Sequence, residues 1–408
     1  MISEIISKDK CTGCELCANV CNHNAIKMVS DDMGFYYPNI NEACIECNLC
    51  KIKCDERLIK TNNYLEPETY AAWSKDKDIR YNSTSGGLFS ELANEIIRMG
   101  GCVVGAQYNE DNLVEHVLVE NLIGIEKIRQ SKYIQSRSGN IYQIVKKMLN
   151  ENRYVAFCGT PCQVAALNSY LGHKSFEKLI TIDFICRGVN SPKAFKAWLN
   201  EIENSNNSKV VKVWFKYKEG GWKTSPKRTR LDFKNGNFKI KDGKENLFMY
   251  GYLTSNLYIR PSCGDCDFKG IPRQSDITLA DFWGIESKLD DDKGTSLVLI
   301  NNKKGKALFN RIENNIISYK RNFSEIFEKN VCFNSSVEIP PESEKFLREL
   351  SYKPFSKVLS KYDRIFKLKK WKRRFKKVIK ANSFVREFIG GVSTNISQSV
   401  KSFANFKK

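Results

Sequence analysis

The 408-residue chain is predicted to be an α+β protein with three parts, and three observations lead to this prediction. Two copies of one cysteine spacing lie within roughly the first sixty residues. Alternating helix and strand patterns fill the middle of the chain, and a stretch rich in lysine and arginine follows. We therefore expect a cysteine-rich domain over 1–62, a linker over 63–80, a mixed α/β core over 81–345 and a basic helical tail over 346–408.

Both cysteine runs have the spacing Cys-x2-Cys-x2-Cys-x3-Cys, and they comprise Cys11, Cys14, Cys17 and Cys21, then Cys44, Cys47, Cys50 and Cys54. Thiolates are soft ligands that suit iron, and the short gaps let one loop wrap three of them around one cube. This is the ligand run of a bacterial two-cluster ferredoxin, in which the fourth cysteine binds the other cluster. We expect one [4Fe–4S] cluster on Cys11, Cys14, Cys17 and Cys54 and another on Cys44, Cys47, Cys50 and Cys21.

Zinc and disulfide alternatives fit these runs less well. A structural zinc site takes four ligands, not two triplets each trailed by a fourth. Disulfides need an oxidising compartment, and the N-terminus shows no signal-peptide pattern. Asn22 and Asp55 stand where ferredoxins usually carry proline, which changes the turn and leaves the ligands intact.

Composition and charge narrow the class of protein. The chain has 15 cysteines, only three histidines and a net charge of +20. This cysteine usage fits a reducing cytoplasm, and no apolar run approaches the ~20 residues that span a bilayer. We expect a cytoplasmic protein that is peripheral at the inner membrane face if its tail binds lipid. A nucleic-acid partner ranks last, because the positive charge concentrates in the tail and is not interleaved with aromatic stacking positions.

Helix and strand patterns alternate through the predicted core. Leu88, Leu92 and Ile96 recur at four-residue spacing, and Gly100-Gly101 ends that helix. Further segments are expected as helices over 141–149 and 162–171, as strands over 102–106, 155–157, 181–185, 277–279 and 296–300, and as a β-rich insertion over 205–250. Pro161 suits the first position of its helix.

The tail contains a basic helical pattern. Residues 361–380 include eleven Lys or Arg and one Asp, and Ile365, Leu368, Trp371, Phe375 and Val378 recur at helical spacing. Such a helix lies on an anionic membrane surface or is a lysine-rich helix in solvent, and the sequence leaves both alternatives open.

Six motifs occur in a fixed order along the chain: Ser85–Ser90 (SGGLFS), Lys132–Ser136 (KYIQS), Gly159–Gln163 (GTPCQ), Cys186–Pro192 (CRGVNSP), Arg260–Cys266 (RPSCGDC) and Ser275–Gly284 (SDITLADFWG). Together they resemble the β-subunit family of coenzyme F420 hydrogenases and dehydrogenases, over roughly residues 1–300. Six ordered motifs are much more specific than any one of them alone.

The resemblance implies FAD, iron–sulfur clusters and electron transfer to a hydride-accepting substrate. It implies that the flavin is lined by Ser85, Gly86, Gly87, Gln135, Thr160 and Asp281. Taken alone, the serine-glycine stretch opens a helix whose N–H groups could hold a phosphate, although such helix starts are common. Family members with this N-terminal module resemble proteins found with surface-polysaccharide biosynthesis enzymes.

Four further cysteines fall inside the family-like motifs, namely Cys162, Cys186, Cys263 and Cys266. They could hold a third [4Fe–4S] cluster beside the flavin. A zinc site, a redox pair or a plain turn remain alternatives for the pair Cys263 and Cys266. Cys102, Cys158 and Cys332 are interpreted as small buried hydrophobes, with an exchange of roles between Cys158 and Cys162 left open.

The sequence therefore predicts an iron–sulfur flavoprotein oxidoreductase that receives electrons from a ferredoxin-like donor. The alternative is a non-catalytic electron-transfer subunit that feeds a partner enzyme. The charge and the low histidine count suggest an anionic substrate, such as a nucleotide-sugar or a lipid-linked sugar phosphate. No residue identifies a deazaflavin.

Overall fold

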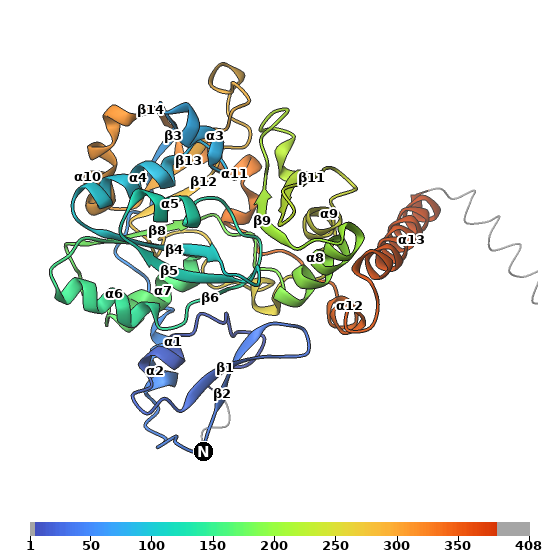
Figure 1. The fold of residues 1–408 in the computed structure, drawn as a ribbon, viewed down its shortest axis with the longest axis horizontal. Helices are drawn as coiled ribbons and strands as arrows, with labels where there is room; N and C mark the ends of the chain where they lie inside the picture. The colour runs from blue at the N-terminus through green and yellow to red at the C-terminus, as the bar shows by residue number, and fades with distance from the viewer. Residues whose placement is uncertain (1–4, 382–408) are drawn as a thin grey trace, which may run out of the picture. The chain divides into compact units, whose positions relative to one another are not determined.

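The computed structural model describes the backbone of residues 5–381 and the side chains of residues 5–368. The chain divides into two compact units, Met1–Phe355 and Ser356–Lys408, and each is described by itself. The first unit has the mixed α/β architecture that the sequence predicts, with a cysteine-rich module at its N-terminal end (Figure 1).

The N-terminal module is built from two similar halves. In each half a cysteine loop leads into a short helix, and a hairpin joins the halves; the elements are α1 (Leu16–Val20), β1 (Ile26–Ser30), β2 (Tyr36–Ile40) and α2 (Leu49–Glu56). The Asp31 carboxylate closes the hairpin turn by accepting hydrogen bonds from the N–H groups of Met33 and Phe35, both at 3.0 Å. Gly34 provides the left-handed backbone of this turn, at a φ of 82°.

A nine-stranded sheet forms the centre of the first unit. Its strands lie in the order β14 (Ile316–Arg321), β3 (Glu68–Ser74), β13 (Ser296–Ile300), β12 (Ile277–Asp281), β8 (Leu179–Phe184), β7 (Val155–Cys158), β4 (Cys102–Tyr108), β5 (Val114–Val119) and β6 (Ser136–Arg137). The central strands β12, β8, β7 and β4 run parallel. Strands covered on both faces are mostly apolar, which is why these segments could be recognised in the sequence.

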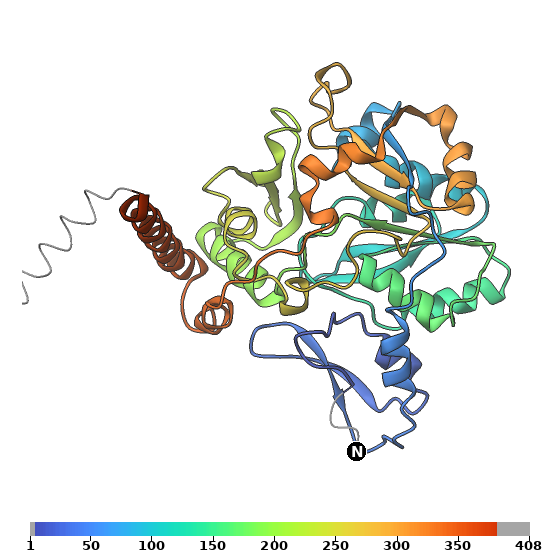
Figure 2. The same cartoon turned by 180° about the vertical axis from the view of Figure 1, so that it is seen from behind.

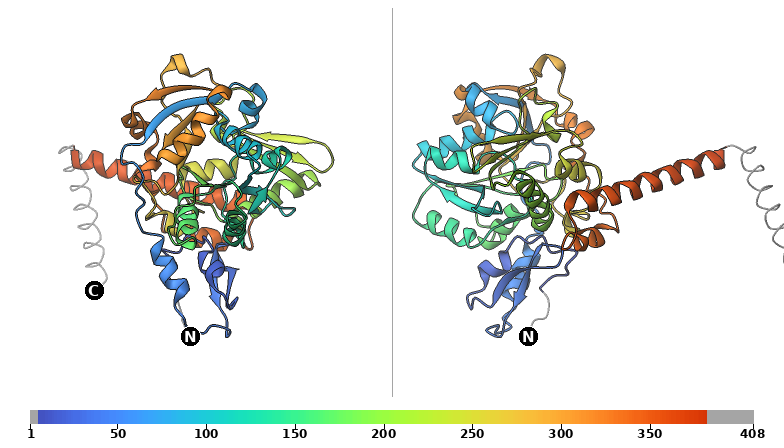
Figure 3. Two further views of the ribbon diagram at one scale, coloured as in Figure 1. Left: turned by 90° about the vertical axis from the view of Figure 1, so that its left-hand side faces the viewer. Right: turned by 45° about the vertical axis from the view of Figure 1, so that its right-hand side comes forward.

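Helices cover both faces of this sheet (Figure 2). One face packs on α4 (Leu88–Arg98), α5 (Leu122–Ile128) and α10 (Lys303–Arg311), and the other on α6 (Ile141–Asn150) and α7 (Pro161–Tyr170). The N-terminal module lies against α6 and α7, so its apolar residues Leu16 and Val20 belong to the same buried cluster as Leu167 and Leu171 (Figure 3).

An insertion between β8 and β12 carries the predicted β-rich segment. It contains α8 (Pro192–Asn206), β9 (Val210–Phe215), β10 (Thr229–Phe233), β11 (Phe238–Lys241) and α9 (Leu247–Thr254). The three strands form an antiparallel sheet, and Phe195, Trp198, Phe215 and Phe248 pack their rings together beneath it. Short 3-10 turns lie at Ser225–Lys227, Pro261–Cys263, Ser287–Leu289, Glu313–Asn315, Phe323–Glu325 and Val331–Phe333.

The expected linker over 63–80 is wrong. Residues Glu68–Ser74 form β3, which pairs with β13 on one side and β14 on the other, and α3 (Lys77–Asn82) follows. Ala71 and Ala72 are fully buried within the sheet. Because polar residues flank this short strand on both sides, its sequence pattern is weak. The core therefore begins at β3, before residue 81.

The boundary of the predicted tail also needs correction. After α11 (Ile326–Lys329), helix α12 (Ser343–Glu349) belongs to the first unit, where Phe346 packs on Tyr258 with ring centroids 5.8 Å apart. The first unit therefore extends to Phe355 and not to residue 345.

The second unit contains the predicted basic helix within α13 (Phe355–Ala381). The side chains of Trp371, Phe375 and Val378 and all of 382–408 lie outside the described residues. Among the helices that the structure describes, none is both long and apolar enough to cross a bilayer.

Candidate functional site: three sets of cysteines

The first cysteine set is buried where the N-terminal module meets the core. Burial raises the pKa of Cys17, and so do its neighbours Cys14, Cys11 and Cys54. The structure thus brings together the three thiols of the first run and the last thiol of the second run. Left-handed backbone at Gly13 and Glu15 lets the loop turn around this set.

The second set repeats this geometry at the surface. Left-handed backbone recurs at Glu46 and Asn48, each 33 positions after its counterpart in the first loop. Burial raises the pKa of Cys50, with smaller contributions from Cys47 and Cys21, so the last thiol of the first run lies in this set. Cys47 is exposed, whereas all four thiols of the first set are buried. The set formed with Cys44 therefore faces solvent.

The third set lies at the carboxyl ends of the parallel strands. Cys162 follows β7 in the first turn of α7, and Cys186 follows β8. Cys263 and Cys266 come from the turn after Arg260, and all four cysteines line one cavity. Ligands of open α/β sheets bind beyond the carboxyl ends of the strands, so the cavity lies where the fold favours a bound group.

Helix α7 begins in a way that fixes Cys162. Thr160 and Gln163 form a reciprocal capping box, and Pro161 occupies the first helical position. The Thr160 hydroxyl also lies 3.0 Å from the Cys162 sulfur. The second residue of the helix is thus held at the cavity.

The thiols of the third set are close enough to influence one another. Burial raises the pKa of Cys162, Cys186 and Cys263 to about 12, and neighbouring thiols add to each shift. These contributions link each of the four cysteines to the other three, Cys266 included. Burial and mutual repulsion both favour the neutral thiols until a cation compensates their charge.

The donor set fits a [4Fe–4S] cluster. A cube holds its thiolates at its corners, farther apart than the ligands of a single ion, and no described His, Cys, Asp or Glu residues form a group of three around one ion. Arg187, Lys269 and Arg273 line the cavity beside the thiols. Lys269 donates to the carbonyls of Cys186 and Cys332, at 2.5 and 2.8 Å. Cationic side chains favour an anionic cluster over free thiols.

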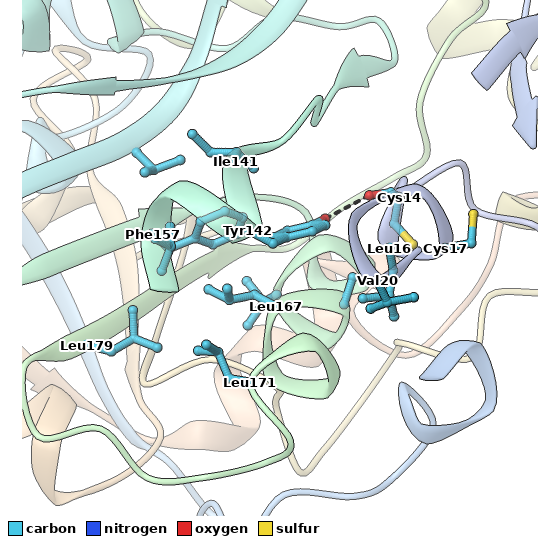
Figure 4. Close-up of a cluster of buried hydrophobic side chains, with 14 of the residues drawn as sticks. Cys14, Leu16, Cys17, Val20, Ile141, Tyr142, Phe157, Leu167, Leu171 and Leu179 are labelled. Carbon is cyan, nitrogen blue, oxygen red and sulfur yellow. Dashed lines mark hydrogen bonds between the residues drawn. The ribbon is translucent and has the colours of Figure 1, made fainter. Parts of the chain in front are cut away.

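The first and third sets share a wall. The Tyr142 hydroxyl from α6 donates to the Cys14 carbonyl at 2.8 Å (Figure 4). Cys14 contributes to the raised pKa of Cys162, and Thr12 and Gly13 from the first loop line the third cavity.

Two buried side chains fix this wall. Arg260, which is fully buried, donates to the Cys11 carbonyl at 2.7 Å and to the Gln135 side chain at 3.0 Å. Glu15 pairs with Arg137 at 2.5 Å and accepts hydrogen bonds from the N–H groups of Ser138 and Gly139.

The residues predicted to line a flavin fall into two groups. Gln135 and Thr160 line the cysteine cavity. Ser85, Gly86 and Asp281 lie beside β13, where the Gly86 N–H donates to the Ser296 hydroxyl and Asp281 pairs with Ser296 in the sheet register. Gly87 is the N-cap of α4 next to them, with a φ of 96°.

Most polar groups of these residues already have partners. The Ser85 hydroxyl donates to the Thr295 carbonyl, the Gln135 amide is held by Arg260, and Thr160 caps α7. Asp281 forms an ion pair with Lys216, and its second carboxylate oxygen is buried without a partner. The six residues thus fall into two groups, and the second carboxylate oxygen of Asp281 is the one buried side-chain acceptor among them without a partner in the described structure.

Sequence reasoning missed Cys332 and Arg57. Cys332 was interpreted as a small buried hydrophobe, but it lines the third cavity with the other four cysteines. Nothing in its surroundings, Val331 and Phe333, marks it as unusual. Arg57, three residues after the last ligand of the second run, donates to the sulfurs of Cys54 and Cys14.

Cys158 and Cys102 do not join any set. Cys158 is absent from the cavity lining, so the exchange of roles with Cys162 is not favoured. Its carbonyl contacts the His116 ring at 3.2 Å. Cys102 is fully buried in β4.

Comparison with known proteins finds matches for the core and for the N-terminal module. Residues 152–324 match the family described as the C terminus of the coenzyme F420 hydrogenase/dehydrogenase beta subunit, and residues 10–59 match the 4Fe-4S dicluster domain. A ferredoxin from Methanocaldococcus jannaschii is 33% identical over 55 residues, which is 14% of this chain and 71% of that protein.

A solved structure is also similar in part. It is a chain of the xenon-derivatised F420-reducing [NiFe] hydrogenase complex from Methanosarcina barkeri, with 19% sequence identity and a TM-score of 0.44. The similarity covers 75% of this chain and 94% of that one.

The protein is an iron–sulfur protein with an N-terminal 4Fe–4S dicluster domain on a mixed α/β core. Its core matches the C-terminal family of coenzyme F420 hydrogenase/dehydrogenase beta subunits over residues 152–324.

Proposed function

We propose that this chain is an electron-transfer oxidoreductase with three [4Fe–4S] clusters, one on each cysteine set. Each cluster accepts and donates one electron at a time when bound. The observation that carries the proposal is the shared wall between the first and third sets, where Thr12 and Gly13 of the first loop line the third cavity. A buried thiol set and a half-buried one so close together suit electron transfer between them.

The exposed second set is the proposed entry for electrons from a ferredoxin-like donor. Cys47 is exposed, and Ile45 beside it is 61% exposed. The first set is buried between this surface and the third cavity. The exposed second set, the buried first set and the third cavity that shares a wall with it therefore give a path from donor to core.

Beyond the third set, the chain offers a second group of polar and aromatic residues. The Tyr133 ring lies 5.5 Å from the ring of Tyr252, whose hydroxyl donates to the Gly188 carbonyl in the cavity wall. Tyr133 also neighbours the Lys216–Asp281 ion pair. This continuity, together with the free oxygen of Asp281, favours a second candidate function, in which the chain binds FAD and reduces a substrate itself.

The substrate and the setting are proposals from the motif resemblance. We propose an anionic acceptor connected with surface-polysaccharide biosynthesis, consistent with the net charge of +20. In the non-catalytic alternative, the cluster of the third set feeds a partner enzyme.

Anaerobic purification followed by iron, zinc and flavin analysis tests the proposal. Three clusters correspond to about 12 irons per chain. The variant C266S should fall towards about 8 irons and lose or change one cluster signal in electron paramagnetic resonance. The matched variant C332S should keep the full iron content, because Cys332 lines the same cavity without belonging to the coupled four.

The result also separates the two candidate functions. Stoichiometric flavin released by acid would favour a catalytic flavoprotein, whereas a flavin-free protein that passes electrons between partners would be an electron-transfer subunit. Zinc in place of iron, or iron loss in C332S but not in C266S, would contradict the assignment of the third set.

A further inference from the structure

Arg57 binds the buried cysteine set directly. Its guanidinium donates to the Cys54 sulfur at 3.1 Å and to the Cys14 sulfur at 3.6 Å, and it also donates to the Thr12 hydroxyl at 2.9 Å. The side chain is 2% exposed. It interacts electrostatically with Cys162 of the third set as well. One cation is therefore buried between two groups of thiols.

The other half of the module lacks this cation. The two cysteine runs are offset by 33 residues, from 11 to 44, and the position equivalent to Arg57 is Asn24. Asn24 is exposed and neutral. The described contact at the Cys21 sulfur is a backbone N–H of Ala25, at 3.4 Å. The two halves thus differ in charge at matching positions.

Two effects oppose each other at the buried set. Reduction adds negative charge, and burial of Cys11, Cys14, Cys17 and Cys54 disfavours that charge relative to the exposed set around Cys47. Burial alone would thus make the inner set the harder one to reduce. A buried guanidinium with N–H donors on two of the sulfurs acts in the opposite direction, because it stabilises the added charge at short range.

We propose that Arg57 raises the reduction potential of the buried cluster above that of the exposed cluster, so that an electron received at the surface comes to rest beside the third set. The inference rests on the proposed function, since it requires both N-terminal clusters. Arg57 then acts on the cluster through the sulfurs of Cys54 and Cys14. The difference in potential directs electrons from the exposed cluster to the buried one.

Redox titration monitored by electron paramagnetic resonance tests this proposal on the full chain. An added paramagnetic lanthanide chelate relaxes the signal of the exposed cluster more strongly, because Cys47 faces solvent and the first set does not. The signal of the third cluster is the one that C266S loses or changes, so the chelate then assigns the two remaining signals to the exposed and the buried cluster of the N-terminal module. In the unaltered protein, the signal protected from the chelate should appear at the higher potential.

Three variants separate charge from hydrogen bonding. R57M removes both, R57Q keeps donors without charge, and R57K keeps charge without the planar fork. The protected signal should shift to lower potential in R57M and R57Q and less in R57K, while the exposed signal stays unchanged. K60Q removes one exposed positive charge from the same module and should shift neither signal.

Each result has a defined meaning. The proposal is overturned if the protected signal has the lower potential in the unaltered protein, a measurement that needs no variant. Equal shifts of both signals in R57Q, or a shift in K60Q of the same size, would also overturn it. A protein without two cubane signals would instead contradict the proposed function.

Discussion

At the scale of single residues, burial determines which titratable side chains make the stability of the fold depend on pH. His116 is stacked on Phe157, with ring centroids 5.8 Å apart, and one ring nitrogen contacts the Cys158 carbonyl. The other ring nitrogen is buried without a partner. Burial lowers the pKa of His116 from about 6.5 to about 4. The folded protein therefore resists protonation of this ring.

This gives a pH dependence with a defined sign. Above about pH 6.5 His116 is neutral in both states, and between pH 6.5 and 4 only the unfolded chain takes up the proton. Stability should fall over that window by about 3 kcal/mol from this residue alone. H116F keeps the stacked ring and removes the proton site.

Urea unfolding under anaerobic conditions at pH 7 and pH 4.5 would measure the effect. The loss of stability on acidification should be smaller in H116F than in the unaltered chain, whatever other groups titrate. An equal loss in both proteins would show that His116 does not carry this dependence.

At the scale of elements, the first cysteine loop is fitted to the core by Gly13. A Cβ there would lie 2.3 Å from the Gln135 amide nitrogen and 2.9 Å from a terminal nitrogen of Arg260. The loop approaches the core this closely because glycine has no side chain. Gly172 has a similar backbone, with a φ of 70° against 66° at Gly13, but no atom lies within 4 Å of its Cβ position.

Gly13 and Gly172 provide a matched pair of positions for mutation. Alanine at either position adds left-handed strain of about 1 kcal/mol. G13A should cost about 1–3 kcal/mol more than G172A, because Gln135 and Arg260 must move. Thermal unfolding and iron retention would compare them. If both variants lose the same stability, then the loop does not depend on close approach to the core.

The parts of the fold that the sequence predicts are those with a local signal. Such signals mark the cysteine loops, the apolar parallel strands and the helix that begins at Pro161. Residues close together in the sequence determine the structure of each of these elements. Strand β3 has only a short pattern between polar flanks, and its partners β13 and β14 are more than two hundred residues away. Its place could not be read from nearby residues.

The candidate site divides in the same way. Cys162, Cys186, Cys263 and Cys266 were predicted from motifs, and the structure gathers them in one cavity. Cys332 joins the site through the tertiary fold alone, and the contact of Arg260 with the Cys11 carbonyl could not be inferred from its motif. The arrangement around Asp281, Ser85 and Gln135 depends on packing that no motif encodes, which is why the flavin contacts stay a prediction.

At the scale of the whole molecule, the cysteine sets and the most strongly basic segment lie in different units. The cysteine sets lie in the first unit, whereas 361–380 carries eleven positive residues. If this tail binds lipid, a chain that ends after Phe355 should lose binding to anionic vesicles and keep its full iron content. Added salt should weaken binding of the full chain, because exposed charges are screened.

Sedimentation with phosphatidylglycerol vesicles, and with neutral phosphatidylcholine vesicles as the control, would measure this binding. Unchanged sedimentation of the shortened chain would contradict the membrane role and favour a lysine-rich helix in solvent.

The 33-residue repeat also has a consequence for how the protein can vary. The first loop turns at Gly13, wedged against Gln135 and Arg260, whereas the second loop makes the same turn at Glu46, on an exposed surface. The repeat thus consists of one copy that packs closely against the core and one whose outer face is exposed to solvent. A saturation library should tolerate substitutions around Glu46 far better than around Gly13, so the chain could adapt to a new redox donor without altering its inner half.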